Sequence, residues 1–158
     1  MGDFVFIARI KSLSRADLYT KSGIMARESL DTASRHVYIL IFPDNDPRNH
    51  NNGGFEFQYR STQGGDSKAI YPSSDTMEPP EFPASFPNTW MKLARTGDKF
   101  DSYYSTSGND WRSFSSHVLK MAPQIYLGFA VTSHHAEQTV TTKVRDIYLL
   151  SGRLITAL

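Results

Sequence analysis

The chain has 158 residues, no cysteine, and 17 basic against 16 acidic residues, for a net charge of +1. This length suits one domain, over residues 1–158, and the absence of cysteine excludes disulfides and thiolate chemistry. Because the charge is balanced and unclustered, we expect no nucleic-acid partner. No segment is apolar enough to insert into a membrane, and the beginning of the chain lacks the features of a signal peptide.

Short apolar runs rich in Val, Ile, Phe and Tyr, separated by Gly, Pro, Asn, Asp and Ser, predict an all-β domain. The first expected strands are DFVFIARI (3–10) and SGIMARES (22–29). The next, RHVYILIF (35–42), has apolar residues at both odd and even positions, which is typical of a central strand that is buried on both faces.

A fourth expected strand, GFEFQYRS (54–61), alternates regularly between aromatic and polar residues. Successive side chains of a strand point to opposite faces of the sheet. The aromatic residues should therefore face the core, and the polar face formed by Glu56, Gln58 and Arg60 is a candidate ligand platform.

Two long segments, 43–54 and 61–88, contain many Gly, Asn and Pro residues and are expected to be irregular. The remaining expected strands are TWMKLARTG (89–97), DKFDSYYS (98–105), WRSFSS (111–116), PQIYLGFAVTSH (123–134) and TTKVRDIYLL (141–150). About ten strands in one domain predict a two-sheet antiparallel jelly-roll sandwich.

Four segments carry a resemblance to a known family: KSGIMARES (21–29), WMKLARTGDKF (90–100), YYSTSGNDW (103–111) and IYLGFAVTSHH (125–135). In this order they resemble a bacterial family of jelly-roll domains of unassigned function in the concanavalin A-like lectin/glucanase superfamily. Members of that family are often modules of secreted or cell-surface carbohydrate-active proteins.

The resemblance implies a glycan-associated jelly roll outside the cell or at its surface, as part of a larger protein. Two features depart from the family pattern. Ser107 stands where the hairpin motif usually has Asp, and the amino-terminal portion of a full-length family domain is expected to be missing before Gly2.

The YYSTSGNDW segment predicts a tight hairpin, because its Ser, Gly and Asn residues favour positive φ and bonds from side chain to backbone. We interpret it chiefly as a structural signature of the fold, with Tyr104 and Trp111 covering the turn. Direct contact with a ligand is the alternative interpretation.

The candidate metal ligands form no strong pattern. His134 and His135 are adjacent and would point to opposite faces of a strand, and His36, His50 and His117 lack ligand spacing. We therefore predict no metal site and no cofactor. Asp44 and Asp46 offer hard oxygen ligands, so structural calcium stays open beside an ordinary turn.

Alternation places several further polar side chains on outward faces. In YLGFAVTSH (126–134) it directs His134 outward with Gly128, Ala130 and Thr132, and elsewhere it directs Arg27 and Tyr103 outward. The candidate ligand-binding residues are Arg27, Glu56, Gln58, Arg60, Tyr103 and His134. The alternative is that Arg27 and Arg60 only pair with carboxylates on neighbouring strands.

Three functions are compatible with this set. The first is a non-catalytic carbohydrate-binding or cell-surface module, with a glycan as partner, hydrogen bonds from Arg27, Gln58, Arg60 and His134, and stacking on Tyr103. The second is a polysaccharide-cleaving enzyme; a lyase could use Tyr103 or His134 as base, whereas a glycosidase needs two suitably placed carboxylates that the sequence does not offer. The third is a structural or protein-interaction domain.

Overall fold

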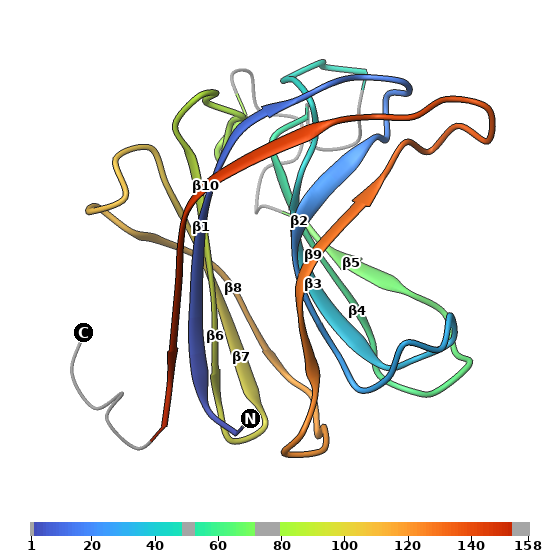
Figure 1. The fold of residues 1–158 in the computed structure, drawn as a ribbon, viewed down its shortest axis with the longest axis vertical. Coiled ribbons are helices and arrows are strands. Elements are labelled where there is room, and N and C mark those ends of the chain that lie inside the picture. Colours follow the sequence, from blue (N-terminus) through green and yellow to red (C-terminus); the bar gives the residue numbers. More distant parts are fainter. Residues whose placement is uncertain (1, 49–52, 72–79, 153–158) are drawn as a thin grey trace.

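A computed structural model describes residues 2–48, 53–71 and 80–152, and these residues form strands without an α-helix (Figure 1). The strands are β1 (Phe4–Leu13), β2 (Lys21–Arg27), β3 (His36–Ile41), β4 (Phe55–Arg60), β5 (Lys68–Ile70), β6 (Thr89–Thr96), β7 (Lys99–Ser105), β8 (Arg112–Val118), β9 (Tyr126–Thr132) and β10 (Thr142–Ser151). No helix in the described ranges could cross a membrane.

The strands make two five-stranded antiparallel sheets that face each other. One sheet has the order β10-β1-β6-β7-β8 and is called here the β1 sheet; the other has the order β5-β4-β3-β2-β9 and is called the β3 sheet (Figure 1). Strands from both ends of the chain therefore pair side by side, as β1 does with β10. This architecture confirms the predicted two-sheet jelly-roll sandwich.

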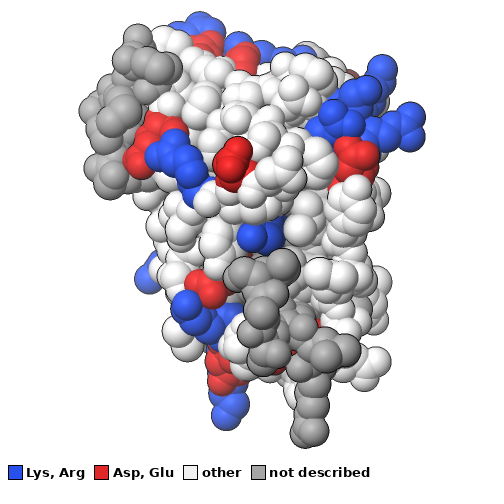
Figure 2. Space-filling model, turned by 90° about the vertical axis from the view of Figure 1, so that its left-hand side faces the viewer, with Lys and Arg blue, Asp and Glu red and all other residues white. Residues whose placement is uncertain are grey.

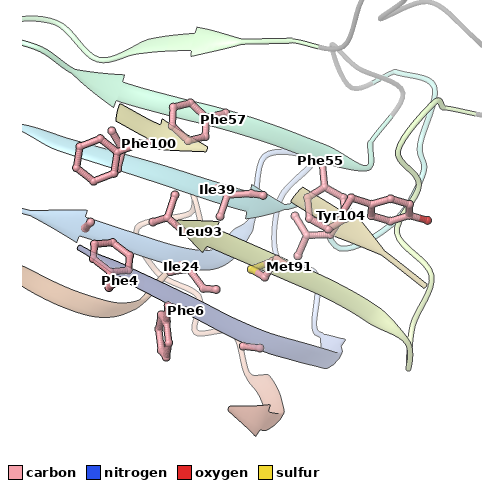
Figure 3. Packing of buried hydrophobic residues seen from close by; sticks show 14 of the residues in the cluster. Phe4, Phe6, Ile24, Ile39, Phe55, Phe57, Met91, Leu93, Phe100 and Tyr104 are labelled. Carbon is pink, nitrogen blue, oxygen red and sulfur yellow. The ribbon is translucent and has the colours of Figure 1, made fainter. Parts of the chain in front are cut away.

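The core lies between the sheets and is built by the alternation that the sequence predicted (Figure 3). Inward-facing side chains from both sheets are fully buried there, including Phe4, Ile24, Ile39, Phe55, Phe57, Met91, Leu93 and Phe100. Burying one such side chain stabilises a fold by roughly 1.5–3 kcal/mol. The aromatic side of β4 is thus fixed inward, which directs its polar side outward.

The central strand β3 is buried on both faces, as its continuous apolar run predicted. Its outward residues Tyr38 and Leu40, together with Phe42, form a second small cluster against Met25 and Ala130. This cluster gives the outer face of the β3 sheet an apolar floor between polar margins.

Strand β5 lies inside the segment 61–88, which was expected to be irregular. It has only three residues, with Lys68, Ala69 and Ile70 paired to β4. A strand this short has no periodicity to recognise, and it forms because β4 offers a free edge. Residues 72–79 of the proline-rich segment lie outside the described residues.

The turn between β7 and β8 is held by its own serines. Ser105 Oγ accepts the backbone N–H groups of Ser107 and Gly108 at 3.1 and 2.9 Å. Gly108 has a φ of 80°, and a Cβ there would lie 2.9 Å from the Trp90 ring. These contacts favour the interpretation of this hairpin as a structural signature of the fold.

We expect Ser105→Ala to destabilise the protein by about 1–3 kcal/mol, because two backbone N–H groups of the turn lose the hydrogen bonds that they make to the buried Ser105 hydroxyl, each worth roughly 0.5–1.5 kcal/mol. Urea unfolding measures this loss. Ser113→Ala, at an exposed position of β8, is the control and should change stability by at most about 0.5 kcal/mol. Equal losses in the two variants would contradict the structural role of Ser105.

Candidate functional site

The outer face of the β3 sheet carries polar side chains from four strands in a regular register. Tyr126 of β9 is paired with Arg27 of β2, Arg27 with His36 of β3, and His36 with Arg60 of β4. Cross-strand partners lie on the same face of a sheet. These four side chains therefore form one row across the sheet.

Beside this row the surface is hollowed. The hollow has a volume of about 320 Å³, near the lower end of the roughly 300–1,000 Å³ typical of small-molecule sites. It is lined by Lys21, Met25, Arg27, Thr32, His36, Tyr38, Gln58, Arg60, Ser67, Ala130, Val131 and Thr132. A second hollow of about 300 Å³ shares Met25, Arg27 and Ala130 with it and extends to Tyr126.

The floor of the hollow is fixed by Tyr38. Its hydroxyl group donates a 2.9 Å hydrogen bond to the carbonyl oxygen of Ala130, so the ring crosses β2, which lies between β3 and β9. Gly23 is the β2 residue paired with Ala130, and it has no side chain to block the crossing. Burial, with a smaller contribution from the Glu56 charge, raises the pKa of Tyr38 far above its ordinary value.

Both arginines of the row are held by backbone carbonyl groups of the loop between β2 and β3. Arg27 donates from Nε to the Ser29 carbonyl at 2.6 Å and from Nη2 to the Asp31 carbonyl. Arg60 Nη1 donates to the carbonyls of Thr32 and Ser34 at 2.8 and 3.3 Å. Among the described residues neither arginine pairs with a carboxylate, so the alternative that they only pair with carboxylates on neighbouring strands is wrong.

The ends of this loop are tied together by an ion pair. Arg35 donates two 2.7 Å hydrogen bonds to the Glu28 carboxylate, one to each oxygen. The same carboxylate accepts the N–H of Ala122 at 2.8 Å. The loop is thus anchored at both ends, and the carbonyl groups that orient the two arginines are fixed with it.

Glu56 and Gln58 lie on the outer face, as predicted, but have different surroundings. Gln58 lines the hollow and donates from Nε2 to Glu56 Oε1 at 2.5 Å. Glu56 is buried and is absent from the lining of the hollow. Burial lowers the pKa of Lys21, and the Glu56 charge opposes this effect.

His134 lies beyond the end of β9, outside the hollow. Strand β9 ends at Thr132, and His134 has a φ of 56°, so alternation no longer fixes its direction. Its Nδ1 is 3.3 Å from an Asp17 carboxylate oxygen, and its ring centroid is 5.5 Å from that of Tyr19. The expectation that His134 continues the outward row of β9 is wrong.

Tyr103 belongs to the other sheet. It lies in β7, opposite Lys92 of β6, whose ammonium group is 4.2 Å from the Tyr103 ring centroid and 4.6 Å from that of Trp111. Tyr103 therefore does not share a face with Arg27 and Arg60. The lyase set of Arg60, Gln58, Tyr103 and His134 is not brought together.

Sequence reasoning missed several residues of this face. Tyr126 is 53% exposed beside Arg27. It supplies the exposed aromatic ring on this face, a role predicted for Tyr103 from the sequence. The alternation that directs Gly128 outward also directs Tyr126 outward, because the two residues are two positions apart on the same strand. Lys21, His36 and Tyr38 also line the hollow, and His36 was interpreted only as a poor metal ligand.

The side of the molecule on which β10 and β1 lie differs from the hollow of the β3 sheet in its distribution of charged side chains. Figure 2 shows that this side is mainly uncharged, with Lys and Arg in small groups beside Asp and Glu. No extended basic patch is visible on this side.

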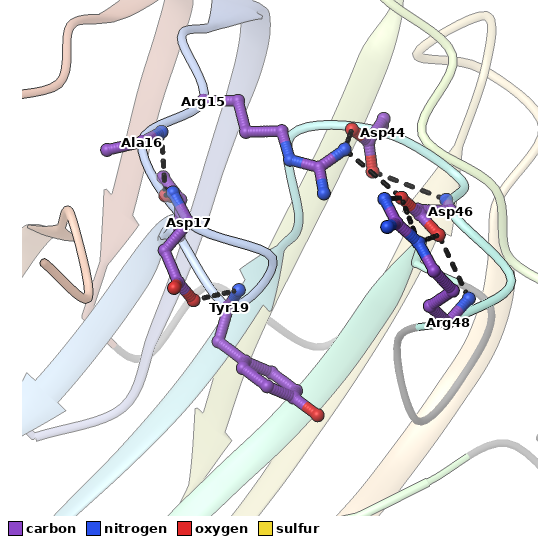
Figure 4. A network of polar contacts seen from close by, with 8 residues as sticks. Arg15, Ala16, Asp17, Tyr19, Asp44, Asp46 and Arg48 are labelled. Carbon is purple, nitrogen blue, oxygen red and sulfur yellow. Dashed lines mark hydrogen bonds and ion pairs between the residues drawn. The ribbon is translucent and has the colours of Figure 1, made fainter.

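Asp44 and Asp46, the possible calcium ligands, face arginines (Figure 4). Arg15 Nη1 is 2.7 Å from an Asp44 oxygen and 3.2 Å from an Asp46 oxygen, and Arg48 Nη2 is 2.6 Å from Asp46. The side-chain bonds of Arg48 are the main cause that holds the pKa of Asp46 well below its ordinary value. No group of three or more metal-binding side chains occurs in the described part of the chain, and His50 lies outside it.

Comparisons with known proteins support the fold. No protein-family model matches the chain, and no curated protein matches its sequence. A functionally unknown protein from Saccharomyces cerevisiae has a similar structure, with a TM-score of 0.64 and 14% identity over 96% of this chain and 71% of that chain.

A mutant of the GH43 protein BlXynB from Bacillus licheniformis is also similar, with a TM-score of 0.66 and 10% identity over 96% of this chain. This chain spans only 28% of the length of that GH43 protein. At such low identity these similarities establish the fold alone. The chain is a two-sheet antiparallel jelly-roll sandwich.

Proposed function

We propose that the chain is a non-catalytic glycan-binding module and that the two adjoining hollows on the β3 sheet are its binding site. The observation that carries this proposal is the row formed by Tyr126, Arg27, His36 and Arg60 beside a hollow with an apolar floor. Sugars need hydrogen-bonding groups for their hydroxyls and an aromatic surface for their apolar ring face. In this proposal Gln58 and the arginines bond the hydroxyls, and Tyr126 provides the stacking surface.

Two further observations agree with the proposal. The segment motifs resemble a family found in exported carbohydrate-active proteins, and one structural neighbour is a GH43 protein. On this basis we also propose that the domain acts outside the cell or at its surface, beside other domains of a larger protein.

Binding is favoured over cleavage by the carboxylates of the site. Hydrolysis of a glycosidic bond needs two carboxyl groups, roughly 5–10 Å apart, that flank the bond. Among the described residues, the lining of the two hollows contains no Asp or Glu, and nearby Glu56 is buried against Gln58. We therefore expect a bound glycan to be released uncleaved.

A glycan array identifies the ligand. Titration calorimetry with the glycan that binds most tightly then compares two tyrosine variants, one on each sheet. Tyr126→Ala should weaken binding by about 3- to 10-fold, because it removes an aromatic surface worth roughly 0.5–1.5 kcal/mol. Tyr103→Ala, on the outer face of the other sheet, should leave the affinity unchanged.

Each other outcome argues against the proposal. Weakening by Tyr103→Ala alone would move the site to the β1 sheet. Shortened products after incubation with the wild-type protein would favour the enzyme. Silence across a broad array would favour the structural or protein-interaction domain.

A further inference from the structure

The hollow on the β3 sheet has an unbalanced charge. Its lining includes the cations Lys21, Arg27 and Arg60 and, among the described residues, no carboxylate. None of the ion pairs found in the described part of the chain involves these three side chains. Among the described residues, the positive charge of the hollow is therefore not neutralised by direct pairing at its surface.

The partners of the arginines leave that charge in place. Arg27 and Arg60 bond to carbonyl oxygens, which orient the guanidinium groups without cancelling their charge. The Glu56 carboxylate accepts the Gln58 amide and is outside the lining. In addition, Arg60 Nε is buried and has no hydrogen-bond partner. A ligand in the hollow therefore meets the other guanidinium nitrogens, with which a charged acceptor forms the strongest bonds.

The geometry sets a spacing for the positive groups. Arg27 and Arg60 are paired on either side of His36, so their strands are separated by one intervening strand, which corresponds to roughly 10 Å. Burial lowers the pKa of His36, and the charges of Arg60 and Arg27 lower it further, while its contact with the Ser34 carbonyl acts in the opposite direction. Both guanidinium groups therefore lie close enough to His36 for their charges to lower its pKa.

We infer that the preferred ligand of this hollow is an acidic glycan, one whose sugar units carry carboxylate groups, as uronic acids do. This inference rests on the proposed glycan-binding function and specifies its ligand class. A carboxylate supplies the negative charge that the lining lacks, and sugar hydroxyls meet Gln58 and Thr132. A neutral glycan makes the hydroxyl contacts and brings no carboxylate to the two guanidinium groups, while Lys21 keeps only the nearby charges of Glu56 and Asp17.

Pairs of glycans that differ only in charge provide the test. Titration calorimetry compares short oligomers of galacturonate, glucuronate and mannuronate with their methyl esters, which keep the sugar ring and remove the charge. A panel of neutral oligosaccharides is measured beside them. We expect at least one acidic oligomer to bind about 10-fold or more tightly than its ester, with an affinity that falls as salt is raised.

Three variants assign the preference to the hollow. Arg60→Gln and Lys21→Gln should each reduce the ratio of acid to ester affinity by about 3- to 10-fold. Lys21 has no hydrogen bond to the β2–β3 loop, so this variant keeps the test informative if Arg60→Gln disturbs that loop. Arg112→Gln, in β8 of the other sheet, should leave the ratio unchanged.

The result that overturns the acidic ligand differs from the one that overturns glycan binding. A neutral glycan bound at the β3 sheet as tightly as any acidic one would refute the inference and leave the proposed function in place. An unchanged ratio in both Lys21→Gln and Arg60→Gln would also refute it. No binding of any glycan would refute both.

Discussion

Phe55→Ala should destabilise the protein by about 3–5 kcal/mol, a large part of the roughly 5–15 kcal/mol typical of a domain. Phe55 is fully buried in β4, and its ring meets that of Tyr104 edge-on at a centroid distance of 5.0 Å (Figure 3). Because Tyr104 comes from the opposite sheet, truncation opens a cavity between the two layers. Urea denaturation followed by fluorescence measures the loss.

Phe129→Ala is the matched control for this truncation. Phe129 lies in the edge strand β9 and is 37% exposed, although its ring is 5.5 Å from that of Phe6. Its removal forms an open notch at the surface, so we expect less than half the loss seen for Phe55→Ala. Similar losses at the two positions would show that the core does not centre on β4 and β7.

Arg95→Met should also be strongly destabilising, by about 3 kcal/mol or more. Arg95 is buried, and its guanidinium group donates to the carbonyl oxygens of Gly97, Met121 and Ala122 at 2.7, 2.8 and 2.9 Å. Methionine keeps much of the apolar stem but leaves these carbonyls without their donor. Thermal and urea unfolding of the variant give the change in stability.

Arg48→Met controls for the loss of an arginine charge. Arg48 is 74% exposed and pairs with Asp46, and exposed ion pairs contribute at most about 1 kcal/mol. Its replacement should therefore change stability little. If Arg48→Met cost as much as Arg95→Met, general charge effects would explain both losses better than the three carbonyl contacts.

The Arg95 contacts also explain one of the motifs that carried the family resemblance. In WMKLARTGDKF the arginine bonds the backbone of the glycine two residues later, while Met91, Leu93 and Phe100 are buried in the core. This motif therefore specifies a strand, a turn and their connection to residues 121–122. A ligand is not needed to account for it.

The sequence predicted the sandwich because alternation and turn residues act locally. Nine expected segments correspond to strands, and the inward and outward faces of β4 were correctly assigned. The expected hairpin also forms, because Ser105, Ser107 and Gly108 satisfy its backbone themselves. Such contacts span few residues and leave a clear pattern.

The candidate site was predicted only in part, because it depends on which strands become neighbours. Arg27, Gln58 and Arg60 meet on one face since β3 lies between β2 and β4. Tyr103 also points outward, but β7 joins the other sheet, and alternation carries no information about sheet membership. His134 failed for a different reason: periodicity does not indicate the residue at which β9 ends.

The carbonyl groups of the β2–β3 loop orient the guanidinium groups of Arg27 and Arg60, because they accept hydrogen bonds from both. Inserting or deleting a residue between Ser29 and Ser34 would shift these carbonyls and re-aim both guanidinium groups at once. Under the proposed function, ligand selectivity could therefore be altered in a single step, with every side chain of the strand row left unchanged.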